Sequence, residues 1–443
     1  MISFALPLGI LFIVFGLVLG FPVGNVFLLG AIIVVAIIKE PLGFIAGAFY
    51  SSLNNYVMMG AGLFIYAGFL LTQAGLADRI VRFSYALVGK VKGGMILVGI
   101  VSTFILSALT GSAMTCVSAT VPLLVDRLAE YGYQKRYTTA VLCASSFLGY
   151  LIPPSVTAMF YCLISQQSVA ALFLATIPAG CMIAFGYGVL NYVLCNRYIN
   201  QELAQKKEEV LKNRWREIKA STFVALPALG VPLVILVGIY GGFFTPNEAG
   251  AVAVTYTFFV GVFVYRELNL RKIFFATKNA VITLGMITLL LGAGTVFTRL
   301  MIREGIAQAL TIWVMNVFHT KIFILLFVNL FLLFLGMVMD ETPVMILVVP
   351  LLLPLMKELN VNLVHFGVIA ILNLGIAIVT PPYAAALFLG ARVSGVKYID
   401  LVKPVIPFIL LVAIPVLVIV TFFPVFSCWL PEVVLGPEFV GTW

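Results

Sequence analysis

Long apolar runs, separated by short polar stretches, recur from one end of the chain to the other. They are continuous rather than alternating, which favours membrane-crossing helices over the strands of a closed barrel. Helices also satisfy their own backbone hydrogen bonds in lipid. The pattern therefore predicts an all-α polytopic membrane protein. We expect ten spans, at residues 4–20, 22–38, 56–73, 138–164, 170–195, 222–240, 247–264, 280–300, 366–391 and 404–424.

Four further apolar arms are too short to be full spans. Two of them flank Thr110-Gly111-Ser112, and the other two flank the segment from Gly336 to Thr342. At 1.5 Å per residue each arm reaches roughly 20 Å, against a hydrocarbon core of about 30 Å. We predict two re-entrant helical hairpins, at 94–125 and 322–356, with tips near mid-membrane. The alternative is two pairs of ordinary, slightly shifted spans.

Two of the predicted spans carry a double proline, Pro153-Pro154 in 138–164 and Pro381-Pro382 in 366–391. Proline removes a backbone donor and clashes with the preceding turn, so both helices should break there. Free carbonyls of an unwound stretch can coordinate a cation. A simple kink is the alternative at each place.

The two halves of the chain resemble each other at a constant offset of 228 residues. Pro122-Leu123-Leu124 matches Pro350-Leu351-Leu352, and the two double prolines match each other. Each half has five spans and a hairpin, and an odd number of spans turns the second half upside down. Inverted repeats with matching broken helices are typical of secondary transporters. The predicted organisation is a first repeat at 1–195, a basic cytoplasmic connector at 196–221, a second repeat at 222–430 and a C-terminal tail at 431–443.

Composition and charge fit this picture. Hydrophobic residues make up 63% of the chain and charged residues 10%, against about 25% charged in soluble domains. The net charge of +9 lies in short loops, so we expect no nucleic-acid partner. With the N-terminus outside, 21 of the 26 Lys and Arg residues fall on the cytoplasmic side, as the positive-inside rule requires. Both termini should then lie outside the cytoplasm. The connector is either a helix on the membrane surface or a plain linker.

The second hairpin tip places two carboxylates, Asp340 and Glu341, deep in an apolar environment. An acid inside a membrane is a functional-site hypothesis, although Asp340 could also cap the helix opened by Pro343. Helix N-termini after Ser112 and after Thr342 offer backbone N–H groups to a carboxylate.

Enzyme chemistry finds little support in the sequence. The six cysteines are scattered without metal or redox spacing, and the two histidines, His319 and His365, lie near span ends, so we find no nucleophile–base pair or metal cluster at one depth. We expect no enzyme activity and no cofactor. A channel is a further alternative, but a pore would not need inverted broken repeats.

Nine short motifs are spread along the chain. They are Thr110-Gly111-Ser112, Gly132-Tyr133, Ile152-Pro153-Pro154-Ser155, Thr245-Pro246-Asn247-Glu248-Ala249, Leu335-Gly336-Met337, Asp340, Thr342-Pro343, His365-Phe366-Gly367-Val368 and Thr380-Pro381-Pro382. In these motifs the chain resembles the large membrane (M, or DctM-like) subunit of tripartite ATP-independent periplasmic (TRAP) transporters. The resemblance covers nearly the whole chain, and it implies a bacterial inner membrane with both termini periplasmic.

The resemblance implies an elevator-type transporter in which the hairpins and broken helices form a mobile transport domain. It implies sodium as the usual coupling ion, a periplasmic substrate-binding protein, and a small four-span membrane subunit beside the scaffold, among membrane lipids. Typical substrates are carboxylates such as C4-dicarboxylates, sugar acids and sialic acids. We therefore expect sodium-coupled secondary import of a small organic anion. The alternative is a related ion-coupled anion carrier that works without a binding protein.

The resemblance also implies site residues. By motif position, one cation falls on Ser107, Thr110, Gly149, Ile152 and Pro154. The shift of 228 residues places a second cation on Leu335, Val338, Ala377, Thr380 and Pro382, and we expect Gly336 and Asp340 to join it. For the substrate we expect Gly111, Ser112, Ser145, Thr342 and Asn373.

Overall fold

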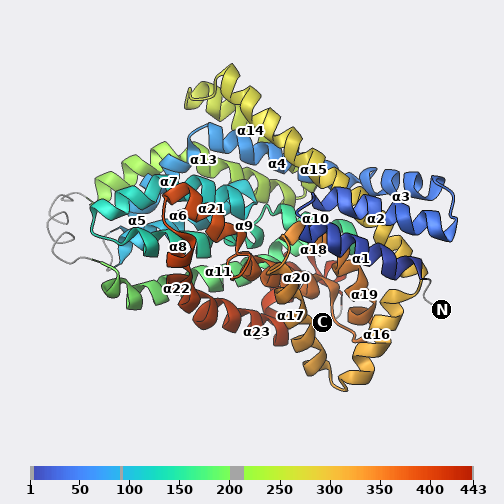
Figure 1. Cartoon of the computed structure of the whole chain (residues 1–443). Coiled ribbons are helices and arrows are strands. Elements are labelled where there is room, and N and C mark those ends of the chain that lie inside the picture. Colours follow the sequence, from blue (N-terminus) through green and yellow to red (C-terminus); the bar gives the residue numbers. More distant parts are fainter. Residues whose placement is uncertain (1–3, 90–92, 200–213, 442–443) are drawn as a thin grey trace.

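The computed structural model describes the backbone of residues 4–89, 93–199 and 214–441. In these ranges the chain is helical, with no strand and one isolated β-bridge between Tyr133 and Ile199. The predicted all-α class is therefore confirmed. Figure 1 shows an elongated bundle with α14 and α4 along one side and α22, α23 and α17 along the other.

The helices of the first part of the chain lie before the proposed connector. They are α1 (Ala5–Val18), α2 (Val23–Ile38), α3 (Gly43–Leu53), α4 (Tyr56–Gln73), α5 (Leu76–Val88), α6 (Gly94–Thr110), α7 (Ala113–Glu130), α8 (Lys135–Ser146), α9 (Leu148–Leu151), α10 (Val156–Ser165), α11 (Val169–Leu194) and the short η1 (Cys195–Arg197).

The helices of the second part follow from residue 214. They are α13 (Arg214–Tyr240), α14 (Pro246–Phe259), η2 (Val260–Val264), α15 (Leu270–Arg303), α16 (Ile306–Val317), α17 (Lys321–Gly336), α18 (Glu341–Leu347), α19 (Val349–Glu358), α20 (Leu363–Ala377), α21 (Ala385–Ser394), α22 (Tyr398–Phe408), η3 (Ile409–Ala413), α23 (Ile414–Phe422), α24 (Val425–Leu435) and η4 (Pro437–Phe439).

Six helical stretches of the described chain are long and apolar enough to cross a membrane, which makes this a multi-pass membrane protein. They are Tyr56–Gln73, Val169–Arg197, Ser221–Tyr240, Pro246–Val264, Leu270–Arg303 and Tyr398–Phe422. The bent pair of α8–α9 and α10 adds a seventh if it is counted as one span. Helices α1 and α2, at 14 and 16 residues, are shorter than a full span.

Both segments predicted as hairpins are helix–turn–helix units. Helices α6 and α7 pack against each other, and Gly111 turns the chain between them at φ +61°. Their lengths of 17 and 18 residues exceed the expected arms, because α7 continues through Pro122 as far as Glu130. In the second unit, α17 leads through residues 337–340 into α18 and α19.

Both segments predicted as broken helices are interrupted at the double prolines. The first changes direction by 41° between Leu151 and Val156. The second is open over residues 378–384, between α20 and α21. The Pro153–Pro154 and Pro381–Pro382 bonds are both cis.

Several helices lie where the sequence pattern placed loops or boundaries. Helices α3, α5 and α16 lie between predicted spans, and α24 runs through residue 431, where we placed the start of a tail. Helix α13 begins inside the proposed connector, much of which lies outside the described residues. The helices α3, α5, α16 and α24 have only 11 to 13 residues, and α5 carries charges such as Asp78 and Arg82, so the search for long apolar runs missed them.

The core of the molecule surrounds the two interrupted helices. Every residue from 137 to 151 is buried, and nearly all of α20 is buried as well. Helices apolar on every face are typical of the centre of a bundle. Helices α6, α7, α11, α21, α22 and α23 contact these central segments. A second apolar cluster joins α1, α2, α3 and α15 at one end.

Candidate substrate and cation site

A cavity of about 590 Å³ lies where both hairpin tips meet the first helix break. Helices α2, α4 and α15 close its other sides. The polar residues that line it come mainly from the two tips and from the broken helix. They are Thr110, Ser112, Thr115, Tyr150, Thr157, Thr283, Asp340, Glu341 and Thr342.

The first tip is pressed against the first break. A Cβ atom on Gly111 would lie 2.5 Å from the Pro154 carbonyl oxygen, and one on Gly149 would lie 2.7 Å from the carbonyl carbon of Ser112. The Val156 N–H donates to the Gly111 carbonyl at 3.3 Å. Only glycine permits two backbones to approach so closely. This contact brings together predicted residues from both segments.

Two predicted cation ligands of the first tip, Ser107 and Thr110, are buried and point back along their own helix. Their hydroxyls donate to the carbonyls of Thr103 and Leu106, at 2.6 and 3.0 Å. A hydroxyl that donates its proton in a hydrogen bond still has lone pairs on its oxygen, and a cation can bind to these. Both also lie within 3.6 Å of the Cys116 sulfur.

The second tip packs against the second break in a similar way. A Cβ on Gly336 would lie 2.5 Å from the Ala377 Cβ, so the tip needs glycine there. The Tyr383 hydroxyl donates to Asp340 Oδ1 at 3.1 Å, and the Tyr398 hydroxyl donates to the Pro382 carbonyl at 3.0 Å.

The remaining predicted ligands of the second cation differ in whether their oxygen atoms have lone pairs that are not already in hydrogen bonds. The Leu335 carbonyl accepts from the N–H groups of Val338 and Met339, at 3.0 and 2.9 Å, so both of its lone pairs are engaged. The Thr380 hydroxyl donates to Ile376 at 2.7 Å and keeps its lone pairs. The side chain of Val338 is 57% exposed.

The predicted substrate residues divide into two groups. Gly111, Ser112 and Thr342 line the cavity. Ser145 and Asn373 lie outside its lining, fully buried among helices. Ser145 donates to the Val141 carbonyl at 2.9 Å.

Asn373 belongs to a buried polar network. It donates to Asn329 Oδ1 at 2.7 Å, and Asn329 in turn donates to the Thr421 hydroxyl at 3.2 Å. The network ties α20 to α17 and α23. In this structure Asn373 therefore holds helices together and does not face the cavity.

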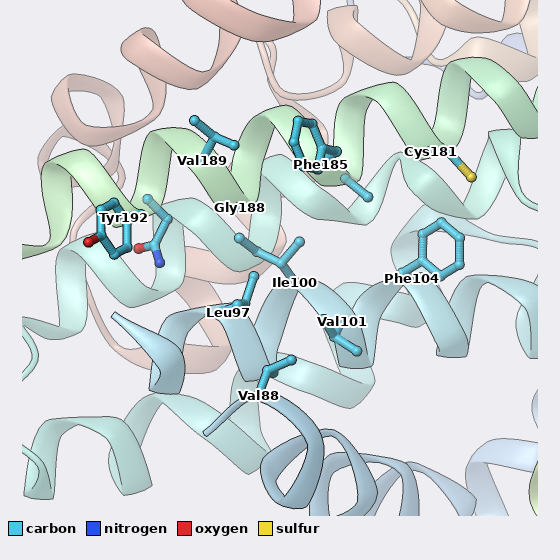
Figure 2. A pocket seen from close by; sticks show the side chains of 12 residues that line it. Val88, Leu97, Ile100, Val101, Phe104, Cys181, Phe185, Gly188, Val189 and Tyr192 are labelled. Atoms are coloured by element: carbon cyan, nitrogen blue, oxygen red, sulfur yellow. The ribbon is translucent and has the colours of Figure 1, made fainter. Parts of the chain in front are cut away.

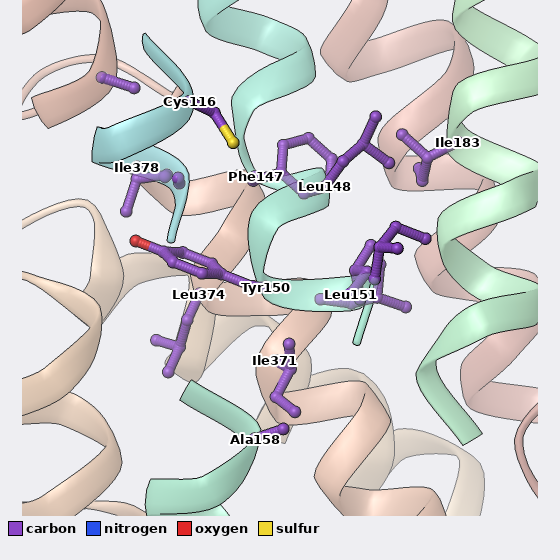
Figure 3. Close-up of a cluster of buried hydrophobic side chains, with 14 of the residues drawn as sticks. Cys116, Phe147, Leu148, Tyr150, Leu151, Ala158, Ile183, Ile371, Leu374 and Ile378 are labelled. Atoms are coloured by element: carbon purple, nitrogen blue, oxygen red, sulfur yellow. The ribbon is translucent and has the colours of Figure 1, made fainter. Parts of the chain in front are cut away.

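Sequence reasoning missed several residues of the cavity wall, above all Tyr150 and Thr283. Tyr150 stands in the four-residue helix α9 and is 2% exposed. Figure 3 shows its hydroxyl at the end of a ring that points away from α9. Its place three residues before the double proline was an available signal. Thr283 of α15 had none, because its position depends on a long-range contact.

A second cavity, of about 560 Å³, lies between α6 and α11 (Figure 2). Its wall is apolar apart from Cys181, Asn191 and Tyr192, and it includes no residue of either tip. It offers no charged group to an ion or a polar substrate.

Two helix tips that meet an interrupted helix at one cavity, inside a multi-pass bundle, are typical of secondary transporters. The chain belongs to the family described as "Tripartite ATP-independent periplasmic transporter, DctM component", whose model matches residues 8–426. The resemblance inferred from the motifs is therefore confirmed.

Two curated relatives cover most of the chain. The sialic acid TRAP transporter large permease protein SiaM of Vibrio cholerae is 32% identical over 89% of this chain and 91% of its own length. The C4-dicarboxylate TRAP transporter large permease protein DctM of Rhodobacter capsulatus is 30% identical over 89% and 91%.

A solved structure shares the fold. The YdaH transporter of Alcanivorax borkumensis superposes with a TM-score of 0.62, covering 87% of this chain and 88% of that one. The sequences are only 13% identical, so this likeness concerns the fold alone.

Proposed function

We propose that this chain is the transport subunit of a sodium-coupled importer of small organic anions, working by an elevator mechanism in a bacterial inner membrane. The main observation in support is the cavity that is lined by both helix tips and by the first helix break. The names of the relatives, which specify sialic acid and C4-dicarboxylates, support an organic acid as the substrate. The two halves of the chain, 1–195 and 222–430, would be inverted repeats of each other, related by an offset of 228 residues. Both chain termini would be periplasmic.

In this proposal the first cation binds between tip one and break one. Ser107 and Thr110 supply hydroxyl oxygens, and Gly149, Ile152 and Pro154 supply carbonyls. A second cation binds near Asp340 and Thr380, with carbonyls of the second break. The substrate carboxylate takes the N-terminus of α7 at Ser112, because unpaired N–H groups and the helix dipole attract an anion there.

The proposal includes two partners. A periplasmic binding protein delivers the substrate, and a small four-span subunit packs beside the scaffold helices. The family of three-part transporters to which the chain belongs supports both. Uptake by this chain without a binding protein would favour the alternative, a carrier that works alone.

Sodium binding can be tested without knowing the substrate. Purified chain should unfold at a higher temperature in NaCl than in KCl of equal ionic strength. At sodium concentrations 100 times the Kd, the gain should be about 2.7 kcal/mol. Asp340→Asn should shrink this difference, since it removes a negative charge from the second cation site.

Asp126→Asn is the matched control. Asp126 is a surface aspartate, 76% exposed, paired with Lys135 at 2.6 Å. Its variant should keep the full sodium effect. Equal melting in the two salts would count against sodium coupling, and an unchanged effect in Asp340→Asn would remove that residue from the site.

A further inference from the structure

The cavity between the tips carries acid groups without any basic partner. Among the residues that line it, Asp340 and Glu341 are the charged ones, and none is Lys, Arg or His. A cavity meant for a compound with two carboxylates would be expected to supply positive side chains. This one supplies negative charge and a set of hydroxyls.

The two acids differ in their surroundings. Asp340 accepts a hydrogen bond from Tyr383 and lies beside the proposed second cation. Glu341 is half-buried and forms no ion pair with a basic residue in the described part of the chain. A carboxylate withdrawn from water is costly unless a cation pairs with it.

Tyr150 is the neutral polar group nearest to this acid. Its hydroxyl is buried in the cavity wall and faces the Glu341 carboxylate, with which it forms at most a long hydrogen bond. No other described residue bonds to this hydroxyl. A buried hydroxyl held so loosely, beside an acid without a basic partner, fits a ligand group that binds both.

The part of the cavity wall formed by α7 suits an anion. Helix α7 has 18 residues and begins at Ala113, and its N-cap Ser112 makes no side-chain capping bond. Its first N–H groups have no partner within the helix, and those of Met114 and Thr115, which line the cavity, can bind a carboxylate. Helix α18 has seven residues and offers a weaker dipole. The cavity thus has one place for an anion and, at Glu341, one place for a cation.

We propose that Glu341 binds a protonated amine of the transported compound, so that the substrate is a zwitterion, an organic acid that also carries an ammonium group. This inference rests on the proposed function and narrows the substrate class of the same site. Dicarboxylates of equal length would place a second negative charge beside Glu341 and are rejected.

The local charge can be measured with a cysteine reporter in the cavity wall. Cys181 is the exposed one of the six native cysteines, so Cys181→Ser serves as the background. Thr283→Cys in α15 then reports from the side of the cavity formed by that helix. In membrane vesicles carrying the full chain, its rate with a cationic methanethiosulfonate, divided by its rate with the anionic one of similar size, should exceed the same ratio for a free thiol in solution at least about tenfold. Glu341→Gln should reduce this ratio severalfold.

Three matched probes then test substrate class. Propanoate, β-alanine and succinate share a carboxylate and a two-carbon spacer, and they differ in ending with hydrogen, ammonium or carboxylate. β-Alanine should protect Thr283→Cys at about tenfold lower concentration than propanoate, and succinate should protect least. Glu341→Gln should remove the advantage of β-alanine.

Equal protection by the three probes, better protection by succinate, or a reagent ratio that Glu341→Gln leaves unchanged would each overturn the proposal. If Glu341→Gln does not fold, the reagent ratio and the probe order with native Glu341 still decide it. The reagent ratio needs neither sodium nor transport. Its failure therefore separates from a failure of sodium coupling, which the NaCl and KCl melting comparison tests.

Discussion

At the scale of single residues, glycine decides how closely the first tip and the first break approach. Gly149 has the Ser112 carbonyl carbon, the Ala113 nitrogen and the Ser112 oxygen all within 3 Å of where its Cβ would stand. These are backbone atoms, which cannot rotate away as a flexible side chain does. A methyl group there must push the tip away from the break, and the oxygens proposed to hold the first cation separate.

Gly149→Ala should therefore abolish sodium stabilisation while the chain still inserts in the membrane. Overpacking of this kind costs about 1–3 kcal/mol, less than the stability of a folded domain. Gly285→Ala is the matched control, since Gly285 of α15 has no heavy atom within 4 Å of its added Cβ. Thermal unfolding of both variants in NaCl and KCl is the measurement. A normal sodium effect in Gly149→Ala would show that the close approach is dispensable.

The sequence predicted part of this site and missed the rest for physical reasons. Gly111, Ser112, Asp340 and Thr342 stand at helix ends and line the cavity, as expected from short arms around a polar tip. Ser145, which lies near the first break, was expected from the family resemblance. Pattern alone does not show which way a side chain points, and its hydroxyl turned back to its own helix.

At the scale of elements, α5 is held at its start by a cluster of contacts. Arg79 pairs with Glu267 at 2.8 Å, and its guanidinium lies 3.9 Å from the centre of the Tyr265 ring. Arg79 also donates to the Gly75 carbonyl at 2.8 Å. Tyr265 donates to the Val224 carbonyl at 2.9 Å, which connects the cluster to α13. Helix α5 leads from α4 into the first hairpin, so this cluster fixes where the hairpin begins.

Arg79→Ala should destabilise the chain by about 1.5–3 kcal/mol, because charge-assisted hydrogen bonds and a stacked guanidinium are lost together. Lys272→Ala is the control. Lys272 lies 3.9 Å from Glu267, both side chains are more than a third exposed, and its loss should cost under about 1 kcal/mol. The midpoint of thermal unfolding in detergent compares them. Equal midpoints for the two variants would mean that the cluster does not anchor α5.

A comparison of predicted and observed helix boundaries shows which elements the sequence pattern can predict. Long apolar helices such as α15 and α11 were located within a few residues, apart from the ten-residue extension at the start of α15. The short α16 was missed although Gly305 opens it at φ +75°, just as Gly75 opens α5 at +69°. A helix of 12 residues gives too short an apolar run to stand out in the sequence.

At the scale of the whole molecule, orientation in the membrane follows from charge. Twenty-one of 26 basic residues fall on one side if both termini are outside. Alkaline phosphatase needs disulfides and therefore folds outside the cytoplasm. Fused after Gly436 it should be active, and inserted at residue 205 it should be inactive. The reverse pair of activities would turn the molecule over, and equal activities at the two places would invalidate the proposed inverted repeat.

The central packing also has a consequence for how the chain is made. The Tyr161 hydroxyl donates to the Leu363 carbonyl at 2.5 Å, and α8 and α9 contact α22 and α20 from the far end of the sequence. Helices of the first half are therefore synthesised before their packing partners, which lie more than 200 residues downstream. At 5–20 residues per second the wait is about 10–50 s. During that interval the polar helix ends of the nascent chain lack their final neighbours. We expect the insertion machinery to shield these helix ends from lipid until the second half is made.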